Sequence, residues 1–175
     1  MTSTHRSQPP AAVLIGPPGA GKSTVAALVA QRLGVEVHDV DDAIEQAQAR
    51  TIGEIFVQDG ELRFRELERV AVASALAEER GVIALGGGAP MDPDTRKALS
   101  GHRVIFLDVG IADAARRIGF DGSRPLLAVN PRATWIALMR TRRPVYESIA
   151  TWRVDTSGRT PQEVAGEIVN LLEEM

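Results

Sequence analysis

The nine residues GPPGAGKST, at positions 16–24, decide the fold of this chain. They match the G-x-x-x-x-G-K-[ST] pattern, in which glycines let backbone N–H groups wrap closely around phosphate oxygens. An apolar run at 11–15 precedes this segment, and a helical pattern at 22–33 follows it. The N-terminus of that helix would add a partial positive charge where phosphates bind. Pattern and context together predict a strand, a phosphate-binding loop and a helix.

Two side chains of the loop have the chemistry that a bound nucleoside triphosphate requires. Lys22 is placed to reach the β- and γ-phosphates, and the Ser23 hydroxyl is placed to bind Mg2+. A dinucleotide-binding loop is the other glycine-rich possibility, but Gly16, Gly19 and Gly21 do not have the G-x-G-x-x-G spacing. The loop therefore favours a triphosphate with Mg2+ over a dinucleotide.

Strands alternate with helices along the rest of the chain. Short apolar runs lie at 11–15, 35–39, 82–85, 103–108 and 151–155. Helical patterns lie between and after them, for example at 22–33, 61–79, 132–150 and 161–174. This alternation predicts a parallel α/β sheet covered by helices on both faces. We expect a disordered tail at 1–10, a single domain over 11–175, and a long irregular loop at 119–131.

The composition narrows the kind of protein. The formal net charge of -3 over 175 residues argues against general nucleic-acid binding, and the absence of cysteine excludes disulfides and thiolate metal sites. The N-terminal segment MTSTHRSQPP lacks the apolar centre of a signal peptide. No apolar run approaches the ~18 residues that a membrane span needs. We therefore expect a cytoplasmic monomer with no nucleic-acid or membrane partner.

A Mg2+ site needs a carboxylate as well as the Ser23 hydroxyl. Two predicted strands end in aspartate, Asp39 in VEVHD and Asp108 in VIFLD. Both would lie at the carboxyl edge of the sheet, where ligands bind, so position along the strands does not separate them. The strand before Asp108 is more apolar, whereas Asp39 forms the motif DVD with Asp41 directly before a helix. The motif singles out Asp39, and the spacing leaves both carboxylates possible.

Two features indicate a second ligand beside the phosphates. In FRELE, at 64–68, a helix would place Arg65 and Glu68 on one face. In LGGGA, at 85–89, three consecutive glycines follow a strand. Each glycine costs roughly 0.5–1 kcal/mol relative to alanine in regular structure, so the run indicates a backbone that approaches something closely. Taken singly, the two features also fit a surface ion pair and a permissive loop.

Arginines gather towards the C-terminus, with nine of them against three acidic residues between 116 and 159. Arg117 and Arg124 flank or lie within the irregular loop, where a kinase would use arginine to stabilise charge on a transferring phosphoryl group. Arg142, in RTRRPVY, is suited to a small anionic substrate because the guanidinium fork matches a carboxylate. The plainer interpretation is a solvated basic surface.

Seven segments occur here in the order that they have in shikimate kinases: GPPGAGKST, DVDDAIE, IGEIFVQDGELRFRELE, LGGGA, SRPLLA, RRPVY and GRTPQEVA. The chain resembles that family from about residue 11 to 174. The resemblance implies a three-layer α/β/α P-loop fold of the nucleoside-monophosphate-kinase group, with five parallel strands in the order 2-3-1-4-5 and a mobile lid at about 119–131. It also implies transfer of the γ-phosphoryl group of ATP to the 3-hydroxyl of shikimate.

The resemblance implies a role for individual residues. The groups that would bind the nucleotide are Gly16, Gly19, Ala20, Gly21, Lys22, Ser23, Thr24, Arg117, Arg159 and Pro161. The groups that would bind shikimate are Asp41, Arg65, Glu68, Gly86, Gly87, Gly88, Arg124 and Arg142. The catalytic groups would be Lys22, Asp41 and Arg124.

Within these sets the implied roles differ. Ser23 would hold Mg2+ directly and Asp39 through water, which selects Asp39 over Asp108. Asp41 would bind ring hydroxyls near the one that is phosphorylated. Arg65 and Arg142 would clamp the carboxylate of shikimate, and Arg124 in the lid would bridge the two substrates. Arg117, Arg159 and Pro161 would frame the adenine.

Other functions stay possible at this stage. A related kinase could act on gluconate or on a nucleoside monophosphate, although paired carboxylates with two arginines favour a hydroxylated carboxylic acid. A nucleotide-binding regulator without catalytic activity would have no need for Arg65, Asp41 and Arg142 to converge. A nucleic-acid-binding role is disfavoured by the acidic total charge.

Overall fold

The computed structural model describes residues 8–119 and 130–175. A five-stranded parallel sheet in the order β2-β3-β1-β4-β5 forms its centre. The strands are β1 (Ala12–Ile15), β2 (Val37–Asp39), β3 (Val82–Ala84), β4 (Val104–Asp108) and β5 (Trp152–Asp155). The predicted parallel α/β fold and the strand order implied by the family resemblance are both confirmed.

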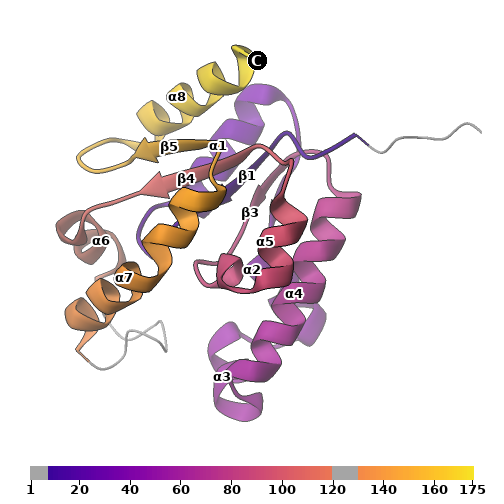
Figure 1. The fold of residues 1–175 in the computed structure, drawn as a ribbon, viewed down its shortest axis with the longest axis vertical. Coiled ribbons are helices and arrows are strands. Elements are labelled where there is room, and N and C mark those ends of the chain that lie inside the picture. Colours follow the sequence, from indigo (N-terminus) through magenta and orange to yellow (C-terminus); the bar gives the residue numbers. More distant parts are fainter. Residues whose placement is uncertain (1–7, 120–129) are drawn as a thin grey trace, which may run out of the picture.

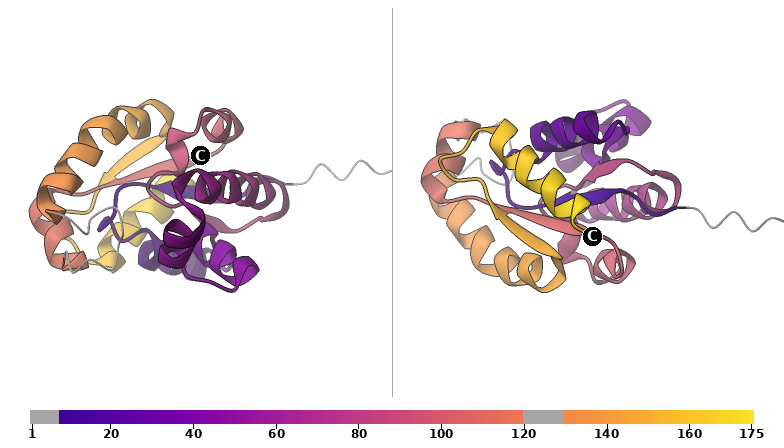
Figure 2. Two further views of the ribbon diagram at one scale, coloured as in Figure 1. Left: turned by 90° about the horizontal axis from the view of Figure 1, so that it is seen from below. Right: turned by 90° about the horizontal axis from the view of Figure 1, so that it is seen from above.

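Helices cover both faces of the sheet. The elements are α1 (Lys22–Leu33), α2 (Val40–Gln48), α3 (Ile52–Asp59), α4 (Glu61–Glu78), the short 3-10 helix η1 (Ala89–Met91), α5 (Pro93–Leu99), α6 (Ile111–Ile118), α7 (Pro131–Ile149) and α8 (Pro161–Glu173). Figures 1 and 2 show α1 and α8 on one face and α5 and α7 on the other. Helices α2, α3 and α4 pack together as a separate group.

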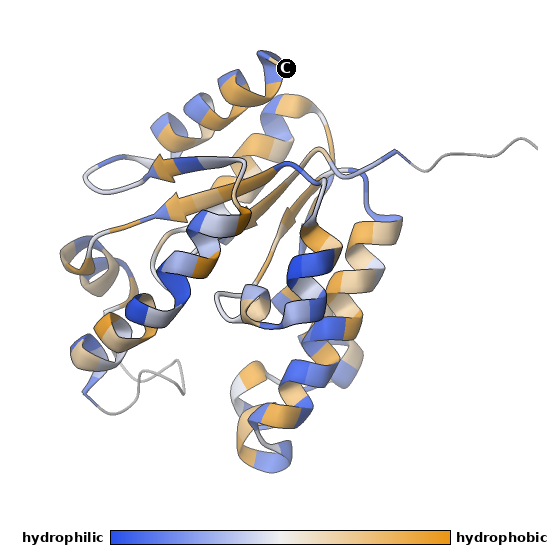
Figure 3. Ribbon diagram, in the orientation of Figure 1, coloured by the Kyte–Doolittle hydropathy of each residue, from blue (hydrophilic) through white to orange (hydrophobic). Residues whose placement is uncertain are grey.

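The core lies along the central strands. Every residue of β1, β3 and β4 is buried, as expected for parallel strands that are covered on both faces. The edge strands β2 and β5 are more exposed. Figure 3 shows mostly hydrophobic residues in the central strands, whereas the helices carry both hydrophobic and hydrophilic residues. The carboxyl ends of the central strands are therefore held rigidly, which gives the loops after them a fixed base.

Local capping signals set the helix boundaries. The Asp39 side chain accepts hydrogen bonds from the first turn of α2. Thr51 and Thr160 each form a capping box, at the start of α3 and of α8. Pro161 occupies the first turn of α8, where its missing N–H costs nothing.

The expected irregular loop lies mostly outside the described residues. Helix α6 ends at Ile118, Gly119 follows in a left-handed conformation, and α7 begins at Pro131. Arg124 is among residues 120–129, which lie outside the described part of the chain, so the predicted lid and the role of Arg124 stay predictions. Among the described helices, none is both long enough and apolar enough to cross a bilayer.

Candidate active site

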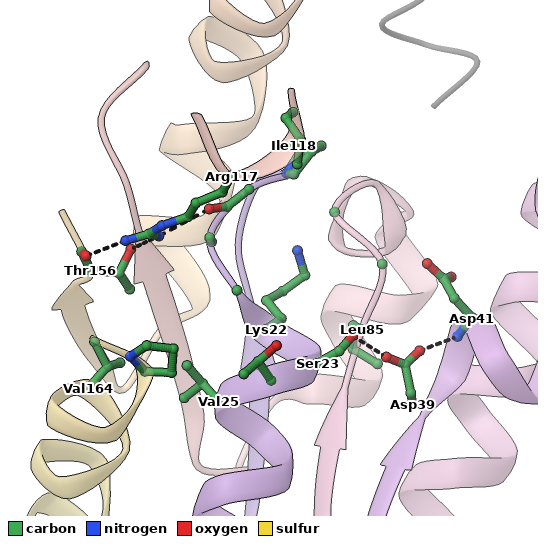
Figure 4. A pocket seen from close by; sticks show the side chains of 18 of the residues that line it. Lys22, Ser23, Val25, Asp39, Asp41, Leu85, Arg117, Ile118, Thr156 and Val164 are labelled. Atoms are coloured by element: carbon green, nitrogen blue, oxygen red, sulfur yellow. Dashed lines mark hydrogen bonds between the residues drawn. The ribbon is translucent and has the colours of Figure 1, made fainter. Parts of the chain in front are cut away.

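The phosphate loop forms one wall of a pocket of about 500 Å3 beyond the carboxyl end of β1. The sequence-predicted residues that line it are Gly19, Ala20, Gly21, Lys22, Ser23, Thr24, Asp39, Asp41, Gly86, Gly87, Arg117, Arg159 and Pro161. The Lys22 ammonium donates to the carbonyls of Gly16 (2.8 Å) and Pro17 (3.0 Å). Figure 4 shows this pocket with Lys22 and Ser23 at its floor.

Two glycines of the loop are required by packing as well as by phosphate chemistry. A Cβ at Gly16 would collide with the Leu107 carbonyl at the end of β4. A Cβ at Gly19, where φ is +85°, would lie 2.8 Å from the Ala114 Cα of α6. The loop is therefore wedged between β4 and α6, which fixes the direction of its N–H groups before any ligand binds.

A hydroxyl and a carboxylate meet at the start of α1 and α2. Ser23 Oγ donates to Asp39 Oδ2 at 2.5 Å, and Asp39 Oδ1 accepts from the N–H groups of Asp41 (3.0 Å) and Asp42 (3.3 Å). Mg2+ in P-loop sites is held by few protein oxygens and completes its shell with water and phosphate, so this donor set fits it. Within the described residues, no group of three or more His, Cys, Asp or Glu side chains forms a metal cluster.

Asp108, the other strand-terminal aspartate, has a different environment. Its Oδ2 accepts from Arg143 Nη1 (2.6 Å) and Arg153 Nη2 (2.5 Å), and its Oδ1 accepts from the Val109 N–H (2.9 Å). Burial raises the pKa of the Asp108 carboxyl, but the hydrogen bonds from Arg143 and Arg153 outweigh it and leave the pKa below its usual value. Asp108 therefore ties β4 to α7 and β5 and does not line the phosphate pocket.

The far end of the pocket is framed by α6, β5 and α8. Arg117 donates to the Thr156 carbonyl (2.6 Å), to the Thr156 hydroxyl (2.8 Å) and to the Gly19 carbonyl (3.1 Å). Figure 4 shows the Arg117 side chain extended towards Thr156. Arg159 pairs with Glu167 at 2.6 Å, and Pro161 lines the wall. A planar base could lie between these arginine and proline side chains.

The three consecutive glycines after β3, at 86–88, pass close to several charged side chains next to the phosphate loop. A Cβ at Gly86 would lie 2.9 Å from Asp41 Oδ1 and 3.2 Å from Glu68 Oε2. At Gly87 it would lie 3.1 Å from Arg142 Nη1 and 3.2 Å from the Gly16 carbonyl oxygen. At Gly88 it would lie 2.5 Å from Arg65 Nη1 and Nη2, an approach that no real Cβ makes. Each glycine thus allows a different functional side chain to rest against the backbone.

Asp41, Arg65, Glu68 and Arg142 consequently converge on one short turn from three different helices. Arg65 Nη1 donates to Glu68 Oε1 at 2.8 Å, and Glu68 is only 3% exposed, so this is not the surface ion pair that the sequence also allowed. Burial raises the pKa of the Glu68 carboxyl, and Arg65 opposes that rise.

Arg142 is also charged, but it differs from Arg65 in having no direct ion pair among the described residues. It is 6% exposed, yet within residues 8–119 and 130–175 no carboxylate lies within ion-pairing distance of its guanidinium. Glu68 acts on this guanidinium only at longer range. A buried guanidinium without a directly paired carboxylate is costly, so such a group fits an anionic ligand. The cluster has the charge and the geometry to bind a small hydroxylated carboxylate beside the phosphate loop.

Sequence reasoning assigned no role to two residues of α7. The hydroxyl of Tyr146 donates to the Gly87 carbonyl at 2.5 Å, and the indole N–H of Trp135 donates to the Pro18 carbonyl at 2.9 Å. The four-residue spacing from Arg142 to Tyr146 could have placed the tyrosine beside the cluster. No local signal connects Trp135 to a loop 117 residues away.

A phosphate loop with a hydroxyl and a carboxylate that fit Mg2+, directly beside a cluster of buried charged side chains, is the arrangement of a P-loop phosphotransferase. The shikimate kinase family model matches residues 18–173. A shikimate kinase from Thermobifida fusca is 55% identical over 91% of this chain and 92% of its own length. One from Streptomyces avermitilis is 53% identical over 94% of this chain and 96% of its own length. The chain belongs to the shikimate kinase family, whose members are ATP-dependent kinases.

A solved structure agrees with this assignment. The shikimate kinase from Acinetobacter baumannii, solved in complex with shikimate, superimposes with a TM-score of 0.91 at 33% sequence identity. The match covers 96% of this chain and 94% of that one. The sequence-based identification of the family and of the P-loop kinase fold is confirmed.

Proposed function

We propose that the protein transfers the γ-phosphoryl group of ATP to the 3-hydroxyl of shikimate, giving shikimate 3-phosphate and ADP. The observation that carries the proposal is the convergence of Asp41, Arg65, Glu68 and Arg142 around the three glycines, next to the phosphate loop. Shikimate has one carboxylate and several hydroxyls, so two arginines and a carboxylate that accepts hydrogen bonds match its chemistry.

On the nucleotide side, the loop N–H groups and Lys22 would bind the β- and γ-phosphates. Lys22 would exchange its present contacts with the carbonyls of Gly16 and Pro17 for phosphate oxygens. Ser23 would hold Mg2+ directly, and Asp39 would hold it through water. The ion would neutralise charge on the phosphates when bound. Arg117, Arg159 and Pro161 would frame the adenine.

On the acceptor side, Arg65 and Arg142 would clamp the carboxylate of shikimate, with Glu68 fixing Arg65. Asp41 would orient the hydroxyl and accept its proton as the oxygen attacks the γ-phosphorus. The bond from that phosphorus to the bridging oxygen of ADP would break in the same displacement. Arg124, outside the described residues, is proposed to stabilise the charge on the transferring group.

The acceptor is tested by measuring ADP release with a panel of shikimate, gluconate, AMP and no acceptor. We expect turnover with shikimate and at most a weak background in the other three reactions. Faster turnover with gluconate or AMP would assign the protein to a related small-molecule kinase. ATP binding without turnover on any acceptor would instead favour a regulatory nucleotide-binding protein.

We further propose that the protein works as a cytoplasmic monomer without nucleic-acid or membrane partners. The formal net charge of -3 supports the absence of a nucleic-acid partner. Light scattering during size-exclusion chromatography tests the monomer, since a mass near twice 18.8 kDa would show a dimer.

A further inference from the structure

Tyr146 is fully buried beside the four side chains Asp41, Arg65, Glu68 and Arg142, which we call the acceptor cluster. Its hydroxyl lies next to the glycine turn that these side chains contact. The hydroxyl donates to the Gly87 carbonyl at 2.5 Å. Arg142 lies one helical turn before Tyr146 on α7, and its positive charge acts on the hydroxyl at close range. Gly87 and Arg142 are themselves in contact, because a Cβ at Gly87 would lie 3.1 Å from Arg142 Nη1. One hydroxyl therefore connects the glycine turn and the arginine on which a substrate carboxylate would rest.

The two arginines of the cluster are oriented by different chemistry. Arg65 is held by the Glu68 carboxylate, which partly neutralises its charge. Arg142 rests against the Gly87 turn, which the phenol of Tyr146 holds by its hydrogen bond. Burial raises the pKa of Tyr146 to about 12, so the phenol stays uncharged at neutral pH. Glu68 interacts with Arg142 only at longer range, so Arg142 can still bind an anion.

We infer that Tyr146 is a positioning residue for substrate binding, because its hydroxyl holds the Gly87 turn, against which the Arg142 guanidinium rests, in the geometry that receives the carboxylate of the acceptor. This inference rests on the proposed function, since it takes shikimate as the acceptor. Tyr146 acts through Arg142 and Gly87 and touches no reacting atom.

The direct test is Tyr146→Phe, which removes one oxygen and keeps the ring that packs on Phe106 with 5.1 Å between centroids. Calorimetric titration of shikimate should show its Kd raised by about fivefold, the effect of one lost hydrogen bond. The Kd of ATP should change less than about twofold, because the phosphate loop keeps its own contacts. An unchanged Kd for shikimate would overturn the inference.

A core variant separates positioning from lost stability. Ile168 is fully buried in α8, on the face of the sheet opposite α7. Ile168→Val should lower the melting temperature while leaving the Kd of shikimate unchanged. If Ile168→Val weakens shikimate binding as much as Tyr146→Phe does, the effect of the tyrosine is general destabilisation and the inference fails.

A double-mutant cycle tests whether Tyr146 acts through Arg142. Arg142→Ala alone should raise the Kd of shikimate by about one to two decades. Adding Tyr146→Phe to Arg142→Ala should change that Kd by less than about threefold, since the group to be oriented is already gone. If the two effects multiply in full, the hydroxyl does not act through the guanidinium.

Labelling gives a readout that needs no tyrosine variant. Tyr146 is the only tyrosine of the chain, so growth on 3-fluorotyrosine places a single fluorine reporter at this position. Saturating shikimate should shift the fluorine resonance of the wild-type sequence, and the shift should disappear in Arg142→Ala. Saturation without any shift would overturn the inference. A wild-type protein that does not bind shikimate at all would instead contradict the proposed function.

Discussion

At Gly88 a hydrogen atom occupies the space beside the Arg65 guanidinium. An added Cβ would lie 2.5 Å from both terminal nitrogens of Arg65 and 2.7 Å from its Cζ. The arginine is the flexible partner, so it would move before the backbone did. Since Arg65 is held by Glu68 on the same helix, such a movement would also break an ion pair at 2.8 Å.

We therefore predict that Gly88→Ala raises the KM for shikimate by roughly tenfold, the effect expected from displacing one charge-assisted hydrogen bond, and leaves the KM for ATP nearly unchanged. Gly166→Ala is the matched control. Its Cβ would lie 2.9 Å from Arg32 Nη1, but this contact joins α1 and α8 away from the acceptor cluster. Steady-state kinetics of both variants test this prediction. It would be contradicted if Gly88→Ala and Gly166→Ala had the same KM for shikimate.

Asp39 and Asp41 are two residues apart, but we predict different kinetic defects when each is changed to asparagine. Asp41→Asn should lower kcat by about 10²–10⁴, the range for loss of a general base, while ATP still binds. Asp39→Asn should show its defect mainly as a higher Mg2+ requirement, because Asp39 contacts Ser23. Kinetics across a Mg2+ series separate the two. Near-normal kcat in a folded Asp41→Asn protein would remove Asp41 from the catalytic role.

Helix α7 contacts both the phosphate loop and the glycine turn at 86–88. Near its start, Trp135 donates to the Pro18 carbonyl of the phosphate loop. Further along, Arg142 and Tyr146 reach the glycine turn, and Arg143 binds Asp108 at the end of β4. One rigid helix thus contacts the nucleotide loop and the acceptor cluster, so we expect ligands on either side to be sensed along it.

This arrangement predicts that Trp135 reports nucleotide binding by fluorescence. Binding at the phosphate loop changes the charge next to Pro18, and the Trp135 indole is only 2.9 Å from that carbonyl. The chain has two tryptophans, so Trp152→Phe leaves Trp135 as the single emitter. Saturating ADP should change emission in Trp152→Phe and leave it unchanged in Trp135→Phe. The opposite pattern would place the sensing at β5.

For the whole molecule, two buried groups set the pH range of stability. The folded pKa of Asp108 lies below its ordinary value of 3.8, so its stabilisation is present above that value and is lost as the pH falls through the folded pKa. The folded pKa of Tyr146 is about 12 against an ordinary 10.0. Its stabilisation is complete below pH 10 and is lost as the pH rises towards 12.

We predict that the free energy of unfolding declines by about 2 kcal/mol between pH 10 and 12 from Tyr146 alone. Tyr146→Phe should lack this decline, whereas Asp108→Asn should keep it and flatten the loss of stability at acid pH. Urea titrations at a series of pH values measure both limbs. An alkaline limb that is the same in Tyr146→Phe as in the wild type would assign it to other groups.

Features that depend on neighbours along the chain could be predicted from the amino-acid sequence. The phosphate loop, the alternation of strands and helices, and the capping box of Thr160 and Glu163 are local, since each is set by residue spacing within one or two turns. The pairing of Arg65 with Glu68 follows from helical periodicity for the same reason.

Features that depend on which distant segments meet became visible in the three-dimensional fold. Asp39 and Asp108 both end strands, but they meet different partners: Ser23 for one, and Arg143 with Arg153 for the other. The run of three glycines at 86–88 predicted a backbone in close contact with another group. It did not predict that each glycine faces a different side chain. The hydroxyl of Tyr146 meets the Gly87 carbonyl across 59 residues. Such contacts depend on strand order and helix packing, which bring together groups whose separation along the chain carries no periodic signal.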